Sequence, residues 1–320
     1  MKLSIGIDVS KKTLDVVFFN GESFIPYNFL NNQDGIQRLI QEILKYREYE
    51  VIITMEATGV YHLNLANQLY AQGYTVSVMN PLVIKRFSEM KMVRAKTDSV
   101  DARVIAQFGF EQNPYIYTPK PDNCQGIVYY LKAIEDLLHL KTQNSNRIEA
   151  LSCCNDAPRG IVESLRKVNE CITMEIKEAE KAIKNIIKQH NQEQYQRLKK
   201  IPGIGDRTSS AIIGYFNEFE CFETAKQVVS FIGVNPSPRI SGTSVRGRGA
   251  ISRKGNKYLR KLFYMAALSA SRHNHSCEQL YNRMLLKGKD KKLALTAVAN
   301  KLIRQVFAIV KYKREYIYQY

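Results

Sequence analysis

Met1–Phe19 has the sequence MKLSIGIDVSKKTLDVVFF, in which two apolar, β-branched runs are separated by a short polar turn. These runs, Lys2–Val9 and Thr13–Phe19, predict the two strands of an antiparallel hairpin. A single acid, Asp8, lies near the end of the first run, where a core strand is normally apolar. An unpaired buried carboxylate costs several kcal/mol, whereas a bound divalent cation reverses that cost. Asp8 is therefore either a metal ligand or the residue that ends the strand and caps the turn.

The residues after this hairpin predict alternating strands and helices. Apolar residues at spacings of three and four indicate helices, and short β-branched runs indicate buried strands. The predicted elements are a strand at Gly21–Leu30, a helix at Gln33–Arg47, a strand at Val51–Met55, a helix at Tyr61–Gln72 and a strand at Tyr74–Met79. The order β-β-β-α-β-α-β, with right-handed crossovers, is typical of a three-layer α/β domain of the RNase H or RuvC type.

Three further acids occupy positions that are able to converge on Asp8. Glu56 directly follows a predicted buried strand, and strand ends in open α/β sheets are where sites form. Residues 96–109, KTDSVDARVIAQFG, predict a helix that carries Asp98 and Asp101 in its first turns. Their spacing of three places both carboxylates on one helix face, although acids in a first turn are also ordinary partners of the helix dipole.

Together the four acids predict a metal site. Sites that transfer phosphoryl groups with two Mg²⁺ ions, about 4 Å apart, need a cage of carboxylates because hard cations prefer oxygen ligands. Mn²⁺ is the alternative ion, since it suits the same ligands. The expected metal ligands are Asp8, Glu56, Asp98 and Asp101. Asp15, on the second strand, is expected at an exposed position outside this set.

The net charge of +17 on the 320 residues is unevenly distributed. Residues 1–120 carry 13 Lys and Arg against 12 Asp and Glu, residues 121–198 carry 11 against 11, and residues 199–320 carry 23 against 7. Basic residues clustered in this way indicate a polyanionic partner. Nucleic acid is favoured over a membrane because the chain has no lipidation signal and no apolar run of about 20 residues. The six cysteines include no C-x-x-C pair, which indicates reduced thiols in the cytoplasm.

The middle of the chain, residues 121–198, predicts long helices. Apolar residues recur at spacings of three and four on both sides of a break near Asn155–Arg159, as in an antiparallel helical hairpin or a coiled coil. Acids and bases alternate between the apolar residues and leave no net charge, which favours a protein partner over DNA. We therefore interpret this region as a spacer through which the protein dimerises. A hairpin within one chain is the alternative.

Ile201–Gly205, with the sequence IPGIG, resembles the turn of a helix-hairpin-helix motif. Such a turn at a helix N-terminus offers backbone N–H groups to a phosphate without base specificity. Gly203 and Gly205 are the expected phosphate-binding residues, and the mostly helical domain at 199–320 that contains them carries nearly all of the excess positive charge.

Asn235–Lys261 has the sequence NPSPRISGTSVRGRGAISRKGNKYLRK, with seven Lys and Arg and no acid from Ser241 onward. One interpretation is a flexible basic loop that binds phosphates, for which no particular serine is needed. The other makes Ser241 a nucleophile, since arginines and a metal stabilise both an alkoxide and the charge that develops on phosphorus. The residues expected to contact nucleic acid here are Arg246, Arg248, Arg253, Lys254, Lys257 and Arg260.

Several motifs in this order resemble one known family. They are GIDVSK, MEATGVY, KTDSVDARVIAQF, IPGIG and ISGTS followed by ISRKGNKYLRKLFYMAAL. The chain is similar over its whole length to RNA-guided insertion-sequence transposases with an Asp-Glu-Asp-Asp RuvC-like domain and a C-terminal serine transposase domain, which are relatives of Piv-type DNA invertases.

The resemblance implies a mechanism and partners. The four acids would hold Mg²⁺, and Ser241 would attack DNA to form a phosphoserine, with Ser244 and Ser252 as lesser candidates. A structured guide RNA, called a bridge RNA, would pair with double-stranded target and donor DNA. The protein would act in the cytoplasm of a bacterium or archaeon, at the nucleoid, as a homo-oligomer whose active sites form between protomers. A dimer is expected, with a tetramer in the synaptic complex as the alternative.

The three expected domains are a RuvC-like catalytic domain at 1–120, a helical dimerisation region at 121–198 and a basic serine transposase domain at 199–320. Two other functions stay open from the residues alone. One is a metal-dependent junction nuclease that hydrolyses DNA with the same acids and no serine. The other is a non-catalytic protein that binds DNA or RNA through the helix-hairpin-helix and the basic tail.

Overall fold

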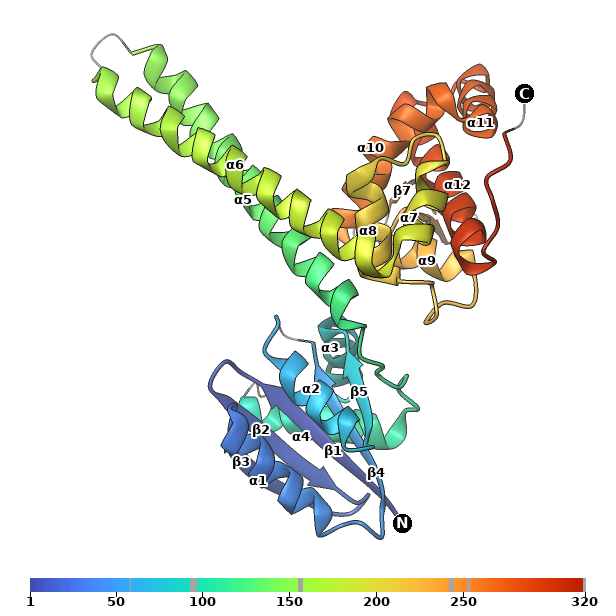
Figure 1. Ribbon diagram of the computed structural model, residues 1–320. Coiled ribbons are helices and arrows are strands. Elements are labelled where there is room, and N and C mark those ends of the chain that lie inside the picture. Colours follow the sequence, from blue (N-terminus) through green and yellow to red (C-terminus); the bar gives the residue numbers. More distant parts are fainter. Residues whose placement is uncertain (58, 93–96, 155–157, 242–244, 252–253, 319–320) are drawn as a thin grey trace. The chain divides into compact units, whose positions relative to one another are not determined.

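The structure is a computed structural model, and it describes residues 1–57, 59–92, 97–154, 158–241, 245–251 and 254–318. For Asp98 and for the described part of 237–250 it describes the backbone alone. The chain divides into two compact units, Met1–Lys120 and Pro121–Tyr320 (Figure 1). Each unit has its own hydrophobic core.

Unit 1 is built on one mixed sheet of five strands, in the order β3-β2-β1-β4-β5. Strands β1, β2 and β3 are antiparallel neighbours, whereas β1, β4 and β5 run parallel. Its elements are β1 (Lys2–Val9), β2 (Thr13–Phe19), β3 (Phe24–Leu30), α1 (Gln33–Leu44), β4 (Glu50–Glu56), α2 (His62–Ala71), β5 (Thr75–Met79), α3 (Pro81–Met90) and α4 (Asp98–Glu111). The predicted order of strands and helices up to β5 is confirmed.

Helix α3 was not predicted, because its basic residues hid the helical pattern. Its start is nevertheless well specified by the sequence. Pro81 occupies the first turn, where its missing N–H costs nothing, and the Asn80 side chain accepts a hydrogen bond from Leu82 N. Ile84 and Phe87 supply its buried face.

The sheet of unit 1 is covered by helices on both faces. One core combines alternate residues of β1 and β2 with the apolar faces of α1 and α2. On the opposite face, Val17 and Phe19 of β2 pack with Ala102 and Ala106 of α4. Because side chains alternate along a strand, the even-numbered residues of β1, which include Asp8, belong to the face that α4 covers.

Helix α4 approaches β1 so closely that no side chain fits between them. A Cβ on Gly6 would lie 2.2 Å from Ala106 N and 2.3 Å from Ala102 O, and a Cβ on Gly109 would lie 2.6 Å from Ser4 Oγ. The later turns of α4 therefore lie over the start of β1, and its earlier turns over the middle. The helix runs antiparallel to the strand, which directs its N-terminus towards the carboxyl end of β1.

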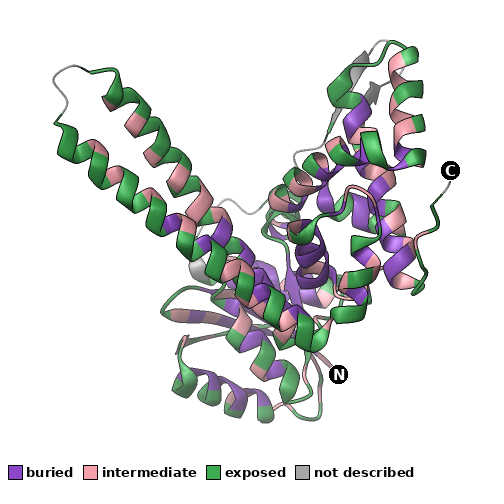
Figure 2. Ribbon diagram, turned by 45° about the horizontal axis from the view of Figure 1, so that its top comes forward, coloured by how far each residue is buried: buried purple, intermediate pink, exposed green. Residues whose placement is uncertain are grey.

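Unit 2 begins with an arm of two long antiparallel helices. Lys141 Nζ donates to Thr173 Oγ1 at 2.7 Å, and Asn169 Nδ2 donates to Ser145 Oγ at 3.2 Å, so the two helices pair along their length. Their buried residues gather near the end of the arm that joins the rest of unit 2, while the outer part is exposed or partly exposed (Figure 2). The arm consists of α5 (Asp122–Ser152) and α6 (Arg159–His190).

The rest of unit 2 is mostly helical, with one strand hairpin. Its elements are α7 (Gln192–Lys199), α8 (Asp206–Phe216), α9 (Ala225–Ile232), β6 (Pro236–Ser241), β7 (Val245–Ile251), α10 (Lys257–His273), α11 (His275–Leu286) and α12 (Lys291–Lys311). The loop expected at Asn235–Lys261 instead contains the antiparallel β6–β7 pair, with an irregular register between Ser237 and Arg239. Prolines in β6 and glycines in β7 removed the alternating pattern that identifies a hairpin in a sequence.

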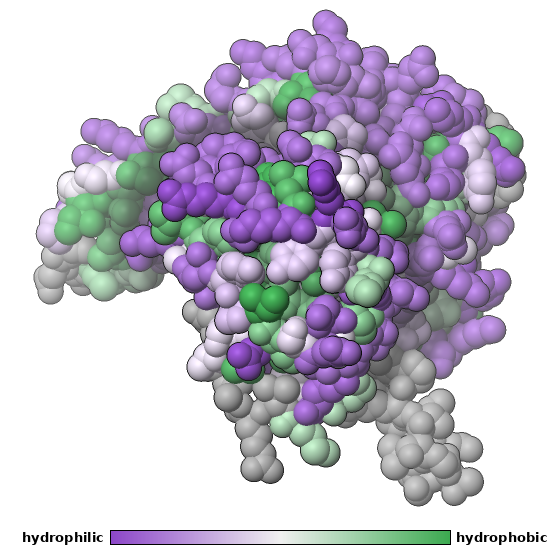
Figure 3. Space-filling view, turned by 90° about the horizontal axis from the view of Figure 1, so that it is seen from below, coloured by the Kyte–Doolittle hydropathy of each residue, from purple (hydrophilic) through white to green (hydrophobic). Residues whose placement is uncertain are grey.

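Helix α12 is the central helix of the core of unit 2. Among the described residues it is the one helix long and apolar enough, by length and composition, to cross a membrane, a test that the buried core helix of a folded domain also passes. Ten of its residues are buried, and eight of these belong to the hydrophobic core of unit 2. On the face shown in Figure 3, hydrophilic side chains predominate, and hydrophobic ones appear in separate groups.

Candidate functional site

Asp8 and Glu56 lie on adjacent parallel strands. The register pairs Ile7 of β1 with Met55 of β4, so one further step along each strand brings the two acids next to each other. Both are partly buried. Since neighbouring residues in register point to the same face, both acids belong to the face of the sheet that α4 covers.

Asp98 and Asp101 begin α4. Thr97 caps the helix, with its hydroxyl accepting a hydrogen bond from Val100 N at 3.4 Å. Asp101 is partly buried and precedes Ala102, the residue whose carbonyl faces Gly6. The antiparallel course of α4 over β1 therefore places its first turns towards the strand ends that carry Asp8 and Glu56.

The structure thus brings three elements with the four predicted acids to one end of one sheet face. A donor set made only of carboxylates suits a hard divalent cation such as Mg²⁺ or Mn²⁺. Among the side chains that the structure describes, no three His, Cys, Asp or Glu form a group that would hold a metal. The side chain of Asp98 is not among them.

Asp15 is a fifth acid at this end of the sheet, and its predicted exposed position was wrong. It is partly buried and lies directly opposite Asp8 in the β1–β2 pair, so it shares the face that α4 covers. Asn28 Nδ2 donates to Asp15 Oδ1 at 2.9 Å. The short turn between the two predicted strands could have indicated this pairing. It is closed by the hydrogen bond from Ser10 N to Thr13 O, which sets the register in which the two acids face each other.

Ser241 is the last residue of β6, and its backbone pairs with Val245 of β7. The serine expected to act as nucleophile is therefore held at the tip of a strand hairpin. Arg246 and Arg248 follow on β7. Ser244, Ser252 and Arg253 lie outside the described residues.

Gly203 and Gly205 lie in the turn between α7 and α8. Gly203 has a φ of +101°, and a Cβ there would lie 2.7 Å from Ala270 Cβ, so a glycine is needed for packing against α10. Gly205, the N-cap residue of α8, is exposed, has a φ of −91°, and a Cβ there would meet nothing within 4 Å. Packing therefore does not explain the second glycine, whereas an open backbone amide is suited to close approach by a ligand.

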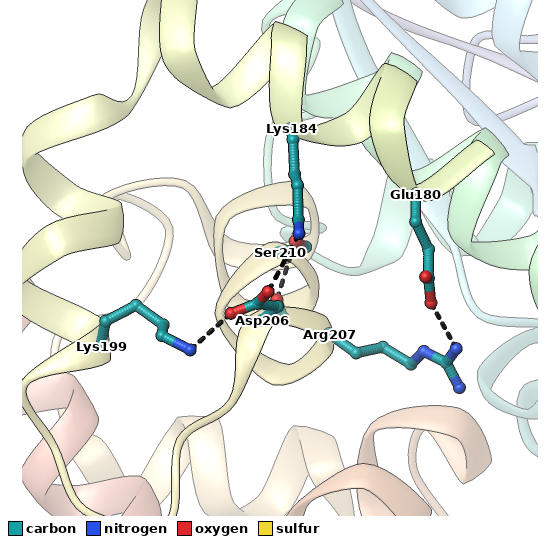
Figure 4. A network of polar contacts seen from close by, with 6 residues as sticks. All are labelled: Glu180, Lys184, Lys199, Asp206, Arg207 and Ser210. Carbon is teal, nitrogen blue, oxygen red and sulfur yellow. Dashed lines mark hydrogen bonds and ion pairs between the residues drawn. The ribbon is translucent and has the colours of Figure 1, made fainter. Parts of the chain in front are cut away.

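An ion-pair network surrounds the N-terminus of α8 (Figure 4). Asp206, the first residue of α8, binds Lys199 of α7 and lies 3.3 Å from Lys184 of α6. The bond from Lys199 is the largest of the effects that lower the pKa of the Asp206 carboxyl to about 2. Arg207 Nη2 donates to Glu180 of α6 at 2.5 Å. The network ties the arm to α7 and α8.

The basic residues before and in α10 have different surroundings. Lys254 and Lys257 are exposed. Arg260 Nη1, by contrast, donates to the carbonyls of Ile232 and Lys254, each at 3.2 Å. Arg260 therefore holds the segment before α10 against the end of α9.

Comparisons with known proteins identify two matching regions. Residues 5–151 match a family model described as "Transposase", of the DEDD type of IS110, and residues 195–282 match one described as "Transposase IS116/IS110/IS902 family". The pilin gene-inverting proteins of Moraxella lacunata and Moraxella bovis are each 30% identical to the chain, over 98% of both sequences. The transposase for insertion sequence element IS1111A of Coxiella burnetii is 24% identical over 82% of the chain and 79% of its own length.

Among solved structures, the chain is similar to T. thermophilus RuvC in complex with a Holliday junction substrate. The similarity covers 37% of the chain and 100% of the RuvC chain, with a TM-score of 0.29 and 11% sequence identity.

Proposed function

Because this chain belongs to the IS110-type transposase family, which also contains the pilin gene-inverting proteins, we propose that it cleaves and rejoins DNA through a phosphoserine formed at Ser241. Membership of this family makes the chain a DNA transposase or recombinase enzyme. In the proposed reaction the Ser241 hydroxyl loses its proton and forms a bond from Oγ to phosphorus, while the bond to the leaving strand oxygen breaks and that oxygen takes up a proton, so that a free hydroxyl end is released. Rejoining is the reverse, with a different strand end as the attacking group.

The observation that supports this proposal is that the backbone positions of the four acids belong to elements that meet at one end of one sheet face. Asp8, Glu56, Asp98 and Asp101 come from two adjacent parallel strands and from the helix that packs over them. These residues would hold Mg²⁺, which when bound would neutralise charge on the scissile phosphate. The strand order with three antiparallel and two further parallel strands supports a fold of the RNase H or RuvC type.

The proposed partners follow from charge and family. Unit 2 carries the basic excess, and the exposed Lys254, Lys257 and Gly205 backbone would contact phosphates of target and donor DNA together with Arg246, Arg248 and Arg253. We further propose a structured guide RNA, a homo-oligomer joined through the α5–α6 arm, and action at the nucleoid in the cytoplasm. We also propose that unit 2 consists of two domains, a helical dimerisation region at 121–198 and a basic serine transposase domain at 199–320.

Trapping of covalent protein–DNA adducts on denaturing gels tests the serine. We expect Ser241→Ala to abolish adducts while nucleic-acid affinity stays within about twofold, because the change removes one hydroxyl and no charge. Ser244→Ala and Ser252→Ala, in the same basic segment, should still form adducts. Adducts that persist in Ser241→Ala but disappear in one of the other two variants would assign the nucleophile elsewhere.

The same assay tests the acids. Asp101→Asn should slow metal-dependent adduct formation by about 10²-fold or more, the scale of losing one electrostatic contact to a transition state. Asp34→Asn is the matched control, because Asp34 is an exposed acid in the first turn of α1. Strand cleavage without any adduct would favour the junction nuclease, and activity that survives EDTA would contradict the metal site.

A further inference from the structure

A groove in unit 2 lies between the arm and helix α10. It has a volume of about 740 Å³, and it is lined by residues of α5, by Arg207 of α8 and by the first half of α10. All of its lining residues belong to unit 2 and have described side chains. The groove is distinct from the acids of unit 1, from Ser241 and from the glycine turn before α8.

The charge of the groove is strongly positive. Its lining includes Arg207, Lys257, Arg260 and Lys261, against the single acid Glu135. Arg207 and Arg260 also hold other parts of the fold through Glu180 and two backbone carbonyls. The lysines have no such structural role: both are exposed, and among the described residues neither makes an ion pair or a side-chain hydrogen bond. They are therefore available for an anionic ligand.

Aromatic and apolar side chains form the floor between these charges. Tyr258 and Tyr264 are partly exposed in the groove, with Leu138, Leu262 and Met265 beside them. A tyrosine ring offers a flat surface on which a nucleotide base stacks, and such stacking contributes about 1–3 kcal/mol per base. Basic residues interleaved with aromatic ones are typical of surfaces that bind unpaired nucleic acid.

We propose that the groove between α5 and α10 binds a short unpaired segment of nucleic acid, with phosphates on Lys257 and Lys261 and a base against Tyr264. A volume of about 740 Å³ accommodates a few nucleotides but no duplex. The inference deepens the proposed function, because it assigns part of the nucleic-acid contact to single strands held between the arm and α10. It does not depend on the nucleophile or the metal.

Fluorescence anisotropy of the full-length protein tests the proposal. The probes are a labelled single-stranded RNA of about 12 nucleotides, a single-stranded DNA of the same sequence, and the corresponding duplex DNA. The test variant is Lys257→Ala/Lys261→Ala. The matched control is Lys291→Ala/Lys292→Ala, which removes two exposed lysines of unit 2 outside the groove.

The lysine variant should weaken single-strand binding by about tenfold or more, and duplex binding by clearly less. Its slope of log K against log salt for single strands should decrease by about 1.4, because each lost phosphate contact contributes about 0.7. The control should weaken all three probes to a similar, smaller extent. Equal losses for the test and control variants, or a greater loss for the duplex, would overturn the assignment.

Tyr264→Ala provides a second, independent measurement. It removes the ring on which a base would stack and changes no charge, so single-strand affinity should fall about five- to tenfold with an unchanged salt slope. Unchanged affinity would overturn the stacking. Tighter binding of single-stranded RNA than of single-stranded DNA would identify the unpaired segment as RNA, and the reverse order would identify it as DNA. Either result supports the site. These binding results stand whether or not Ser241 and the acids prove catalytic.

Discussion

Asp206 is the residue whose environment gives the clearest expectation for pH dependence. Lys199, followed by Tyr195 and Lys184, lowers its folded-state pKa from 3.8 to about 2. An acid with a lowered pKa stabilises the fold above its unfolded pKa, and that contribution is lost as the pH falls through the folded value. About half of the Asp206 side chain is exposed, so solvent screening keeps the contribution to about 1 kcal/mol or less.

We therefore expect Asp206→Asn to reduce the thermal stability at neutral pH and to flatten its change between about pH 4 and pH 2. Thermal unfolding followed by circular dichroism as a function of pH measures this. In a Lys199→Ala background the effect of Asp206→Asn should be smaller, because the main partner of the carboxylate is already gone. An equal effect in both backgrounds would show that the ion pair contributes nothing to stability.

Among the helices and strands, the contact between α4 and β1 decides where the acids of unit 1 lie. Gly6→Ala would place a methyl group within 2.3 Å of the backbone of α4, which has to shift or tilt. We expect a loss of about 1–3 kcal/mol, the usual cost of overpacking, together with faster hydrogen exchange in β1 and α4. Gly160→Ala is the control, because a Cβ at Gly160 in α6 meets nothing within 4 Å. Protection factors equal to those of the wild type would contradict the close approach.

For the whole molecule, the two units differ most in charge. By the counts above, residues 1–120 have a net charge of +1 and residues 121–320 a net charge of +16. Unit 2 also has a core of its own. We expect residues 121–320 alone to retain most of the affinity for nucleic acid and most of its salt dependence, which for 6–10 phosphate contacts is about 10³–10⁵-fold between 50 and 200 mM salt.

Filter binding of the two fragments at several salt concentrations measures this difference. Residues 1–120 should bind weakly, with a shallow salt slope, and should add cleavage chemistry when present in the full chain. Comparable slopes for both fragments would show that the charge distribution does not determine where nucleic acid binds.

The sequence by itself determined the order of elements in unit 1 apart from α3, the long helices of the arm and the positions of the acids along their strands and helix. The physical reason is that alternation in strands and three-to-four spacing in helices are local patterns. The hairpin at 1–19 and the strand that ends at Glu56 were predicted to within a residue. The comparisons bear out the resemblance to IS110-type transposases and Piv-type invertases, which depended in part on motifs in these same segments.

Only the tertiary structure decided which residues meet. The β6–β7 hairpin depends on pairing between two strands whose glycines and prolines give no local signal. Asp15 faces Asp8 because of the register of a pair, and the groove between α5 and α10 unites residues more than a hundred positions apart. Such contacts depend on how the elements pack, and Gly6 and Gly203 allow neighbouring helices to approach closely. Packing also buries the Tyr258 hydroxyl without a hydrogen-bond partner among the described residues, which no local pattern in the sequence indicates.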